Sequence, residues 1–245
     1  MKIQETGCQQ TSLFWILVTL FSRIILFPVF QAFIALFFVI QGVASAWNES
    51  IAWWPVTAIL TNIVCLALMN LLLKREGLNL FSLYRFDYLR SMRNLLLALG
   101  GLAIAAVLTA IPNTLGALLL FGDRLAGVEM MFRPLPAWSV WMIIAFFPVT
   151  VALTELPMYF GYVMPRLKLL AGRKWIAVVA SGFCFGAQHA FLPLIFDWRF
   201  ILWRLIMLML FTLFVAILLN WRPRLLPFYL IGHFIINLQF ALLLF

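Results

Sequence analysis

Three ionisable side chains stand out because they lie inside long apolar runs of the chain. Of the 8 acidic residues, Glu155 is the one embedded in such a run, and the 2 histidines, His189 and His233, are embedded in two others. Ionisable residues are costly in hydrocarbon, so they usually face a cavity or a partner. A carboxylate beside imidazoles can hold and activate a water molecule. These residues therefore predict acid–base chemistry in an apolar setting.

The spacing of the polar residues favours one shared site. Phe185 and His189 are four positions apart, as are His233 and Asn237, so each pair shares one face of a helix. With about 1.5 Å of helix rise per residue, the polar groups lie roughly 13 to 22 Å from the basic residues that flank their runs on one side. We expect them to meet in a single cavity, where His233 and Asn237 would donate to the oxyanion formed during amide hydrolysis.

The composition excludes a soluble protein. Of 245 residues, 66% are hydrophobic and 10% are charged, and the mean hydropathy is +1.09; a soluble domain is about half apolar and about a quarter charged. The net charge of +9 then reflects basic loops at the inner membrane face. Soluble enzymes and nucleic-acid-binding proteins are excluded, and the expected surroundings are a lipid bilayer.

The apolar runs predict an all-α integral membrane protein. A membrane-spanning helix needs roughly 20 apolar residues. The seven runs that meet this length are 24–46, 51–73, 94–112, 138–160, 175–194, 202–220 and 225–245. Residues 1–23 are expected to form a polar segment and an interfacial helix, residues 24–245 a single transmembrane domain, and residues 74–93 an amphipathic segment on the inner face. Pro157 favours a bend beside Glu155.

The distribution of basic residues predicts the orientation. With the N-terminus inside, most of the 17 Lys and Arg residues lie at the inner face, and an odd number of spans puts the C-terminus outside. The basic residues left for the outer loops are Arg124, Arg133, Arg199 and Arg204. We expect a bacterial inner-membrane location.

Three motifs resemble those of the CPBP family, the CAAX-protease and bacteriocin-processing group of glutamic intramembrane peptidases. The first motif is met partially by the segment from Glu155 to Gly161, the second (FxxxH) by Phe185 to His189, and the third (HxxxN) by His233 to Asn237. These motifs lie within about residues 138–240, which would form the peptidase-like core.

The resemblance implies a role for each motif residue. Glu155 and His189 would activate water without a metal or another cofactor, His233 and Asn237 would hold the oxyanion, and Phe185 and Gly161 would support the site. The substrate would be a peptide or a membrane-anchored protein.

Two positions depart from the family pattern, and they keep other functions open. Leu156 stands where the family has a second glutamate, and Phe160 where it has an arginine. A catalytically silent binding or immunity-type protein is therefore an alternative. A zinc peptidase with Glu155, His189 and His233 as ligands and a proton-coupled transporter are the others.

Overall fold

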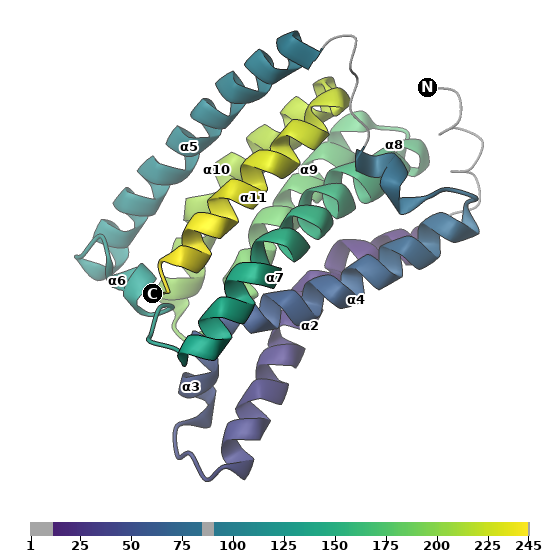
Figure 1. Ribbon diagram of the computed structural model, residues 1–245. Coiled ribbons are helices and arrows are strands. Elements are labelled where there is room, and N and C mark those ends of the chain that lie inside the picture. Colours follow the sequence, from purple (N-terminus) through teal and green to yellow (C-terminus); the bar gives the residue numbers. More distant parts are fainter. Residues whose placement is uncertain (1–11, 85–90, 245) are drawn as a thin grey trace.

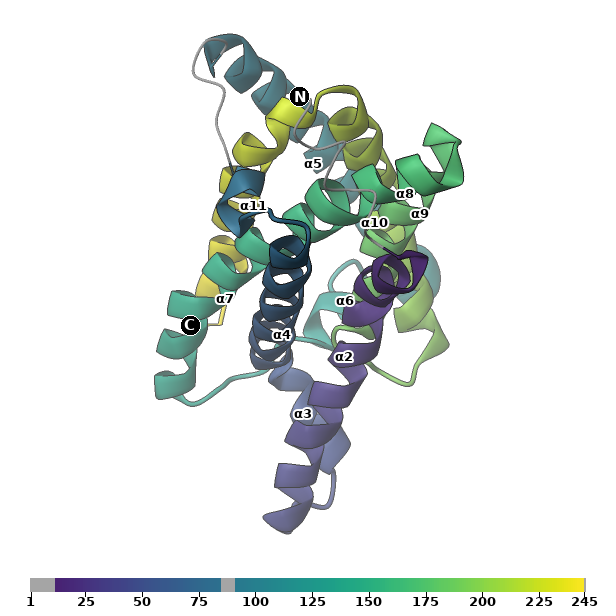
Figure 2. The ribbon, with the colours of Figure 1, turned by 90° about the vertical axis from the view of Figure 1, so that its right-hand side faces the viewer.

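The computed structural model describes residues 12–84 and 91–244, and both views show these residues as a bundle of helices (Figures 1 and 2). Residues 1–11 and 85–90, which belong to the expected polar N-terminal segment and amphipathic segment, lie outside the described residues. The longer helices are α2 (Leu13–Ile40), α4 (Trp54–Arg75), α5 (Ser91–Phe121), α7 (Ala137–Leu156), α9 (Lys174–Ala187), α10 (Trp198–Trp221) and α11 (Leu226–Leu242). The shorter ones are α3 (Ala46–Ala52), η2 (Leu80–Tyr84), α6 (Ala126–Glu129), η4 (Pro157–Val163), α8 (Met164–Ala171), η5 (Gln188–Phe191) and η6 (Pro223–Leu225).

Six helical stretches in this part of the chain are long and apolar enough to cross a membrane. Much of their outer surface consists of large apolar side chains such as Phe33, Leu119 and Ile217, which are more than half exposed. A soluble protein rarely exposes so much apolar surface, whereas lipid solvates it. The protein is thus an all-α polytopic membrane protein, as the composition predicts.

The expected spans match these helices with one difference. Six of them overlap the six membrane-spanning candidates. The seventh, 175–194, corresponds to the 14-residue helix α9 followed by the short 3-10 helix η5. At about 1.5 Å per residue, α9 alone covers about 21 Å, which is less than the hydrocarbon thickness.

The expectation of a separate interfacial helix before residue 24 is wrong. Helix α2 runs without interruption from Leu13 to Ile40, and Arg23 lies in its interior with a fully buried side chain. Arg204, expected in an outer loop, lies within α10 and is also buried. Isolated cations usually flank membrane spans, so the sequence predicts that both arginines lie at membrane faces. Both side chains lie inside the bundle instead.

The helices that carry the motifs are packed together. Helix α7 contacts both α11 and α4, helix α10 contacts α5 and α9, and α2 contacts α4. Figure 1 shows α5, α7, α9, α10 and α11 running side by side, with α2 and α4 crossing them at an angle. In Figure 2 the end of α2 and α3 extend beyond the rest of the bundle.

Two apolar clusters fill the bundle, and a polar side chain from each of α2 and α7 lies between them. One cluster contains Leu20 of α2 and Leu156 of α7, and the other contains Phe27 of α2 and Val151 of α7. Arg23 and Glu155 come between these residues along their helices. The polar side chains thus form a layer inside an otherwise apolar core.

The helix geometry changes after Leu156, the last residue of α7 and the neighbour of Glu155. The seven residues from Pro157 to Val163 form a π-helix, a wider turn that is common at functional sites. Because Pro157 has no N–H, the carbonyl of Leu153 loses its helical partner. The hydroxyl of Tyr84 donates to that carbonyl at 2.9 Å, so η2 supplies the hydrogen bond that proline removes.

Candidate active site

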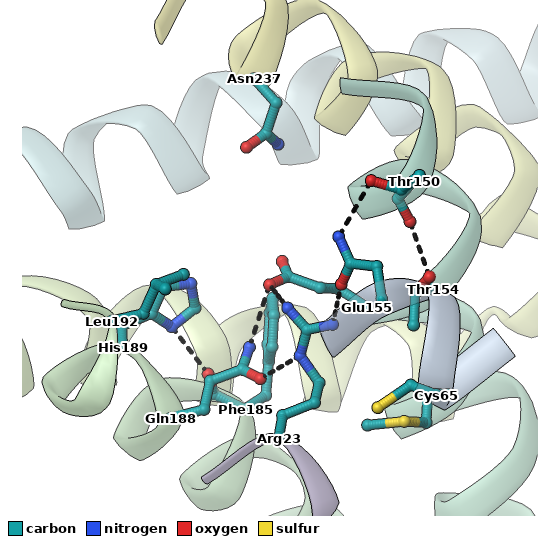
Figure 3. Close-up of polar contacts among 12 residues, drawn as sticks. Arg23, Cys65, Thr150, Thr154, Glu155, Phe185, Gln188, His189, Leu192 and Asn237 are labelled. Atoms are coloured by element: carbon teal, nitrogen blue, oxygen red, sulfur yellow. Dashed lines mark hydrogen bonds and ion pairs between the residues drawn. The ribbon is translucent and has the colours of Figure 1, made fainter. Parts of the chain in front are cut away.

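The Glu155 carboxylate is buried and has partners from three other segments. Its Oε1 accepts from the Arg23 guanidinium in an ion pair and from Gln188 Nε2 at 3.3 Å. Its Oε2 lies 2.8 Å from His233 Nε2. Figure 3 shows Arg23 and Gln188 converging on Glu155. The carboxylate is therefore fixed in position and compensated in charge.

Arg23 belongs to a wider polar network. Its other nitrogens donate to the side-chain oxygens of Gln188 and Asn62, and Tyr159 also donates to Gln188, at 3.2 Å. Sequence reasoning missed these partners of Glu155. The one signal for Arg23 in the sequence is its position between two apolar stretches, and an arginine in that position equally marks a helix end at the membrane face.

The bonding of Glu155 leaves one acceptor position open. A carboxylate has about four lone-pair sites. Two on Oε1 are used by Arg23 and Gln188, and one on Oε2 is used by His233. Because an ionised carboxylate only accepts, His233 Nε2 is the donor in that bond. The remaining site on Oε2 can accept a hydrogen from water.

His189 presents its second ring nitrogen without a protein partner among the described residues. Its Nδ1 lies 2.9 Å from the carbonyl oxygen of Phe185. A carbonyl only accepts, so Nδ1 carries the hydrogen and Nε2 of the neutral ring is an acceptor. The ring of Phe185 packs edge-on against both His189 and His233, with centroids 5.7 and 6.4 Å apart.

Asn237 and Gly161 have different surroundings. The Nδ2 group of Asn237 donates one hydrogen to the backbone oxygen of His233 at 2.7 Å, so one hydrogen remains for a further acceptor. In Figure 3, Asn237 and His189 lie on different sides of Glu155. Gly161 lies away from these groups, where a Cβ would be 3.4 Å from side-chain atoms of Leu226 and Leu83; it allows close packing there.

Apolar packing fills the two positions that depart from the family pattern. Leu156 belongs to the buried core, and Phe160 packs edge-on against Phe185 with ring centroids 5.5 Å apart. Neither substitution leaves a buried charge without a partner, because the position of each expected charge is now apolar.

A cavity of about 640 Å³ joins the predicted site residues. Glu155, His189, His233 and Asn237 all contribute to its walls, together with apolar side chains from α5 and α10. This volume lies within the usual range for sites that bind small ligands. The cavity can therefore admit a short stretch of peptide beside the carboxylate.

The geometry does not support a three-ligand zinc site. Within residues 12–84 and 91–244, no three His, Cys, Asp or Glu side chains converge closely enough to hold a metal ion. Glu155 is also already bound to a cation through Oε1. A positively charged neighbour at this distance disfavours metal binding by the same carboxylate.

Comparison with known families locates the resemblance within the chain. Residues 136–239 match the family model described as type II CAAX prenyl endopeptidase Rce1-like. This region is Rce1-like. The match confirms the resemblance to the CAAX-protease group that the three motifs predict. No curated protein and no solved structure matches the chain.

The Rce1-like region contains all four predicted site residues but not the whole network around them. Glu155, His189, His233 and Asn237 fall within it, whereas Arg23 and Asn62 come from helices that precede it. The N-terminal helices thus complete the polar surroundings of the Rce1-like region. At family level, the match supports a CAAX-type intramembrane protease.

Proposed function

We propose that the protein is a glutamic-type intramembrane peptidase that hydrolyses a peptide bond of a membrane-associated peptide or protein. The observation that carries the proposal is the open acceptor position on Glu155 Oε2 in a cavity shared with His189 and Asn237. Oε2 and His189 Nε2 are acceptors for the two hydrogens of one water molecule. Held in this way, the water directs its lone pair at a peptide carbonyl.

The proposed reaction needs no covalent intermediate with the protein. The water oxygen adds to the carbonyl carbon while Glu155 takes one proton, and the carbonyl oxygen becomes an oxyanion. Asn237 donates its free Nδ2 hydrogen to this oxyanion. The proton on Glu155 then passes to the nitrogen of the leaving group, the C–N bond breaks, and the products are an acid and an amine.

The contacts of His233 favour a role that differs from the one the resemblance implies. Its Nε2 hydrogen is directed to Glu155 and is not available to an oxyanion. We assign His233 and Arg23 to positioning the carboxylate. Phe160 replaces the arginine of the first motif, but Arg23 supplies a positive charge beside Glu155, and this contact supports an active enzyme over a silent relative.

Hydrolysis in isotopically labelled water tests the proposal. The purified protein in nanodiscs would be incubated with a library of N-acylated apolar peptides in H₂¹⁸O, and the products analysed by mass spectrometry. We expect one ¹⁸O atom in the new carboxyl group and no peptide bound covalently to the protein. An acyl-enzyme, or no cleavage of any peptide, would contradict the proposal.

We also propose an inner-membrane location with the first helix entering from the cytoplasmic side. One end of the bundle carries most of the described basic residues, as the positive-inside rule requires of the cytoplasmic face. They lie at the end of α4, at the starts of α5 and α9, and at the junction of α10 with α11. These include Lys74, Arg75, Arg93, Arg173, Lys174, Arg222 and Arg224. A cysteine introduced at Arg173 tests this orientation. We expect a membrane-impermeant thiol reagent to label it from the cytoplasmic side and not from the outside.

A further inference from the structure

Gln31 of α2 is a buried amide that the proposed reaction does not use. It follows Arg23 by eight positions, about 12 Å further along the helix, and both residues are among the buried residues of α2. Its Nε2 donates to the carbonyl of Leu194 at 3.0 Å, and its Oε1 accepts from the N–H of Leu194 at 2.7 Å. One side chain thus bonds both backbone polar groups of a residue in another segment.

The backbone that Gln31 contacts is irregular. Residues 192–197, between η5 and α10, form turns and coil. In an apolar environment, backbone polar groups outside a helix need other partners. For Leu194 these partners come from Gln31 and from Trp47 of α3, whose Nε1 donates to the same carbonyl at 3.2 Å. The ring of Trp47 also stacks on Phe196 with centroids 5.2 Å apart, so this loop is attached to both α2 and α3.

Helix α2 contacts the chain on both sides of His189. Before the histidine, Arg23 donates from Nε to the side chain of Gln188, and the same guanidinium donates from Nη2 to Glu155 (Figure 3). After the histidine, Gln31 bonds the backbone of Leu194. One helix therefore contacts both the segment that carries His189 and the Glu155 carboxylate.

The position of the His189 ring depends on this backbone. The bond from Nδ1 to the carbonyl of Phe185 sets the orientation of the ring against α9. From the side of α10, Arg204 donates to the carbonyls of His189 and Leu192 at 2.9 and 3.1 Å. A catalytic group must lie within hydrogen-bond reach of the water that it activates, and a misplacement of about 1 Å can lower the rate by about 100-fold. The attachment of this segment to α2 therefore bears directly on how far His189 lies from Glu155.

We propose that Gln31 is a positioning residue that, together with Arg23, sets the distance between His189 and Glu155. This inference rests on the proposed peptidase function, in which both side chains bind one water molecule. It assigns part of the reaction geometry to α2, which precedes the Rce1-like region. Gln31 acts through the backbone of Leu194 rather than on the substrate.

The histidine ring signals test this role without catalysis. The chain has 2 histidines, so ¹⁵N-histidine labelling of the protein, purified with a histidine-free tag and placed in nanodiscs, gives NMR signals from His189 and His233 alone. His189→Ala assigns them. Gln31→Met keeps a side chain of similar length and removes both hydrogen bonds to Leu194. We expect it to shift the signals of His189 and to leave those of His233, which is bonded to Glu155, unchanged. Unchanged His189 signals, or equal shifts of both histidines, would overturn the proposal.

Thr19→Val is the matched control on the same helix. Thr19 is also buried, but its hydroxyl donates to the carbonyl of Trp15 within α2. The variant should leave the signals of both histidines unchanged. A shift of His189 as large as that in Gln31→Met would show that any change in the buried part of α2 disturbs the site, and the specific role of Gln31 would be refuted.

Trp47→Phe is a milder change at the same contact. It removes one donor to the Leu194 carbonyl and retains a ring that can stack on Phe196. We expect it to shift the His189 signals in the same direction as Gln31→Met, by a smaller amount. If Gln31→Met does not fold, this variant decides the matter, and unchanged His189 signals in it would overturn the proposal.

Turnover separates positioning from substrate binding. With a cleaved library peptide, Gln31→Met should lower kcat by about 10- to 100-fold and leave KM unchanged, as expected for a misplaced catalytic group. A raised KM with an unchanged kcat would refute the positioning role. If the wild-type protein hydrolyses no peptide, the peptidase function fails, and the His189 signals still decide whether Gln31 positions the ring. Incorporation of ¹⁸O together with unchanged His189 signals would retain the peptidase and refute the role of Gln31.

Discussion

Arg23 of α2 and Glu155 of α7 form an ion pair in the core, although 132 positions separate them in the sequence. Both side chains are almost completely buried. Breaking a buried ion pair by removing one partner costs about 3 to 5 kcal/mol because the other charge is left alone. The first transmembrane helix is therefore joined to the proposed catalytic carboxylate by a strong and specific contact.

Replacement of Arg23 tests its proposed positioning role. We expect Arg23→Met to lower kcat by about 100-fold or more, because the carboxylate loses the group that fixes Oε1, and to destabilise the fold. Arg23→Lys should retain part of the activity because it keeps the charge. Peptide turnover and thermal unfolding in nanodiscs measure both effects.

A double variant separates the charge of Arg23 from its packing. Arg23→Met alone leaves Glu155 as an unpaired buried charge. Adding Glu155→Leu to Arg23→Met removes that charge, so the double variant should have a higher free energy of unfolding than Arg23→Met alone. Strictly additive losses of stability would show that the two side chains do not interact.

The two histidines should respond differently to replacement. The described hydrogen bonds of His189 go to the carbonyls of Phe185 and Gly186 in its own segment, so His189→Ala should change stability little. Because the ring helps to activate the water, the same variant should lower kcat by about 10²- to 10⁴-fold. His233→Ala breaks a bond to Glu155 between helices, so it should lower both activity and stability. Equal losses of stability in the two variants would contradict these roles.

Much of the fold and part of the site could be predicted from the sequence. Glu155, His189 and His233 are recognisable because each interrupts an apolar run, and helical spacing connects Phe185 with His189 and His233 with Asn237. Arg23 could not be placed by the same reading, since a single arginine between two apolar stretches also marks a helix end at the membrane face. Only the packing of α2 against the motif helices shows that its partner is Glu155.

The helix geometry near the site depends on contacts that spacing does not contain. Pro157 predicts that a backbone hydrogen bond is missing from the helix. A helix can accommodate this loss in several ways, and here it does so with a π-helix and a hydrogen bond from Tyr84. The length of α9 could not be predicted from spacing either. The apolar run 175–194 is long enough to span the membrane, yet the α-helix ends at Ala187, and a 3-10 turn places His189 at the cavity.

The hydrogen bond from Tyr84 gives a prediction of pH dependence. Burial raises the pKa of Tyr84 from 10.0 to about 12, so the hydroxyl loses its proton more easily in the unfolded chain than in the folded one. Stability from this group is intact below pH 10 and decreases as the pH rises from about 10 to 12. Tyr84→Phe should be less stable at pH 8 and should show a smaller decrease over that range. Unfolding curves of the two proteins at pH 8, 10 and 11 measure the difference.

The most direct test of the proposed chemistry is the turnover of a cleaved library peptide by Glu155→Gln. This replacement keeps the size of the side chain and can still accept hydrogen bonds, but it removes the base that takes a proton from water. We predict that peptide binding and insertion into the membrane are retained while kcat falls by about 10²- to 10⁴-fold, the usual contribution of a general base. Turnover at the wild-type rate would show that Glu155 does not activate the water.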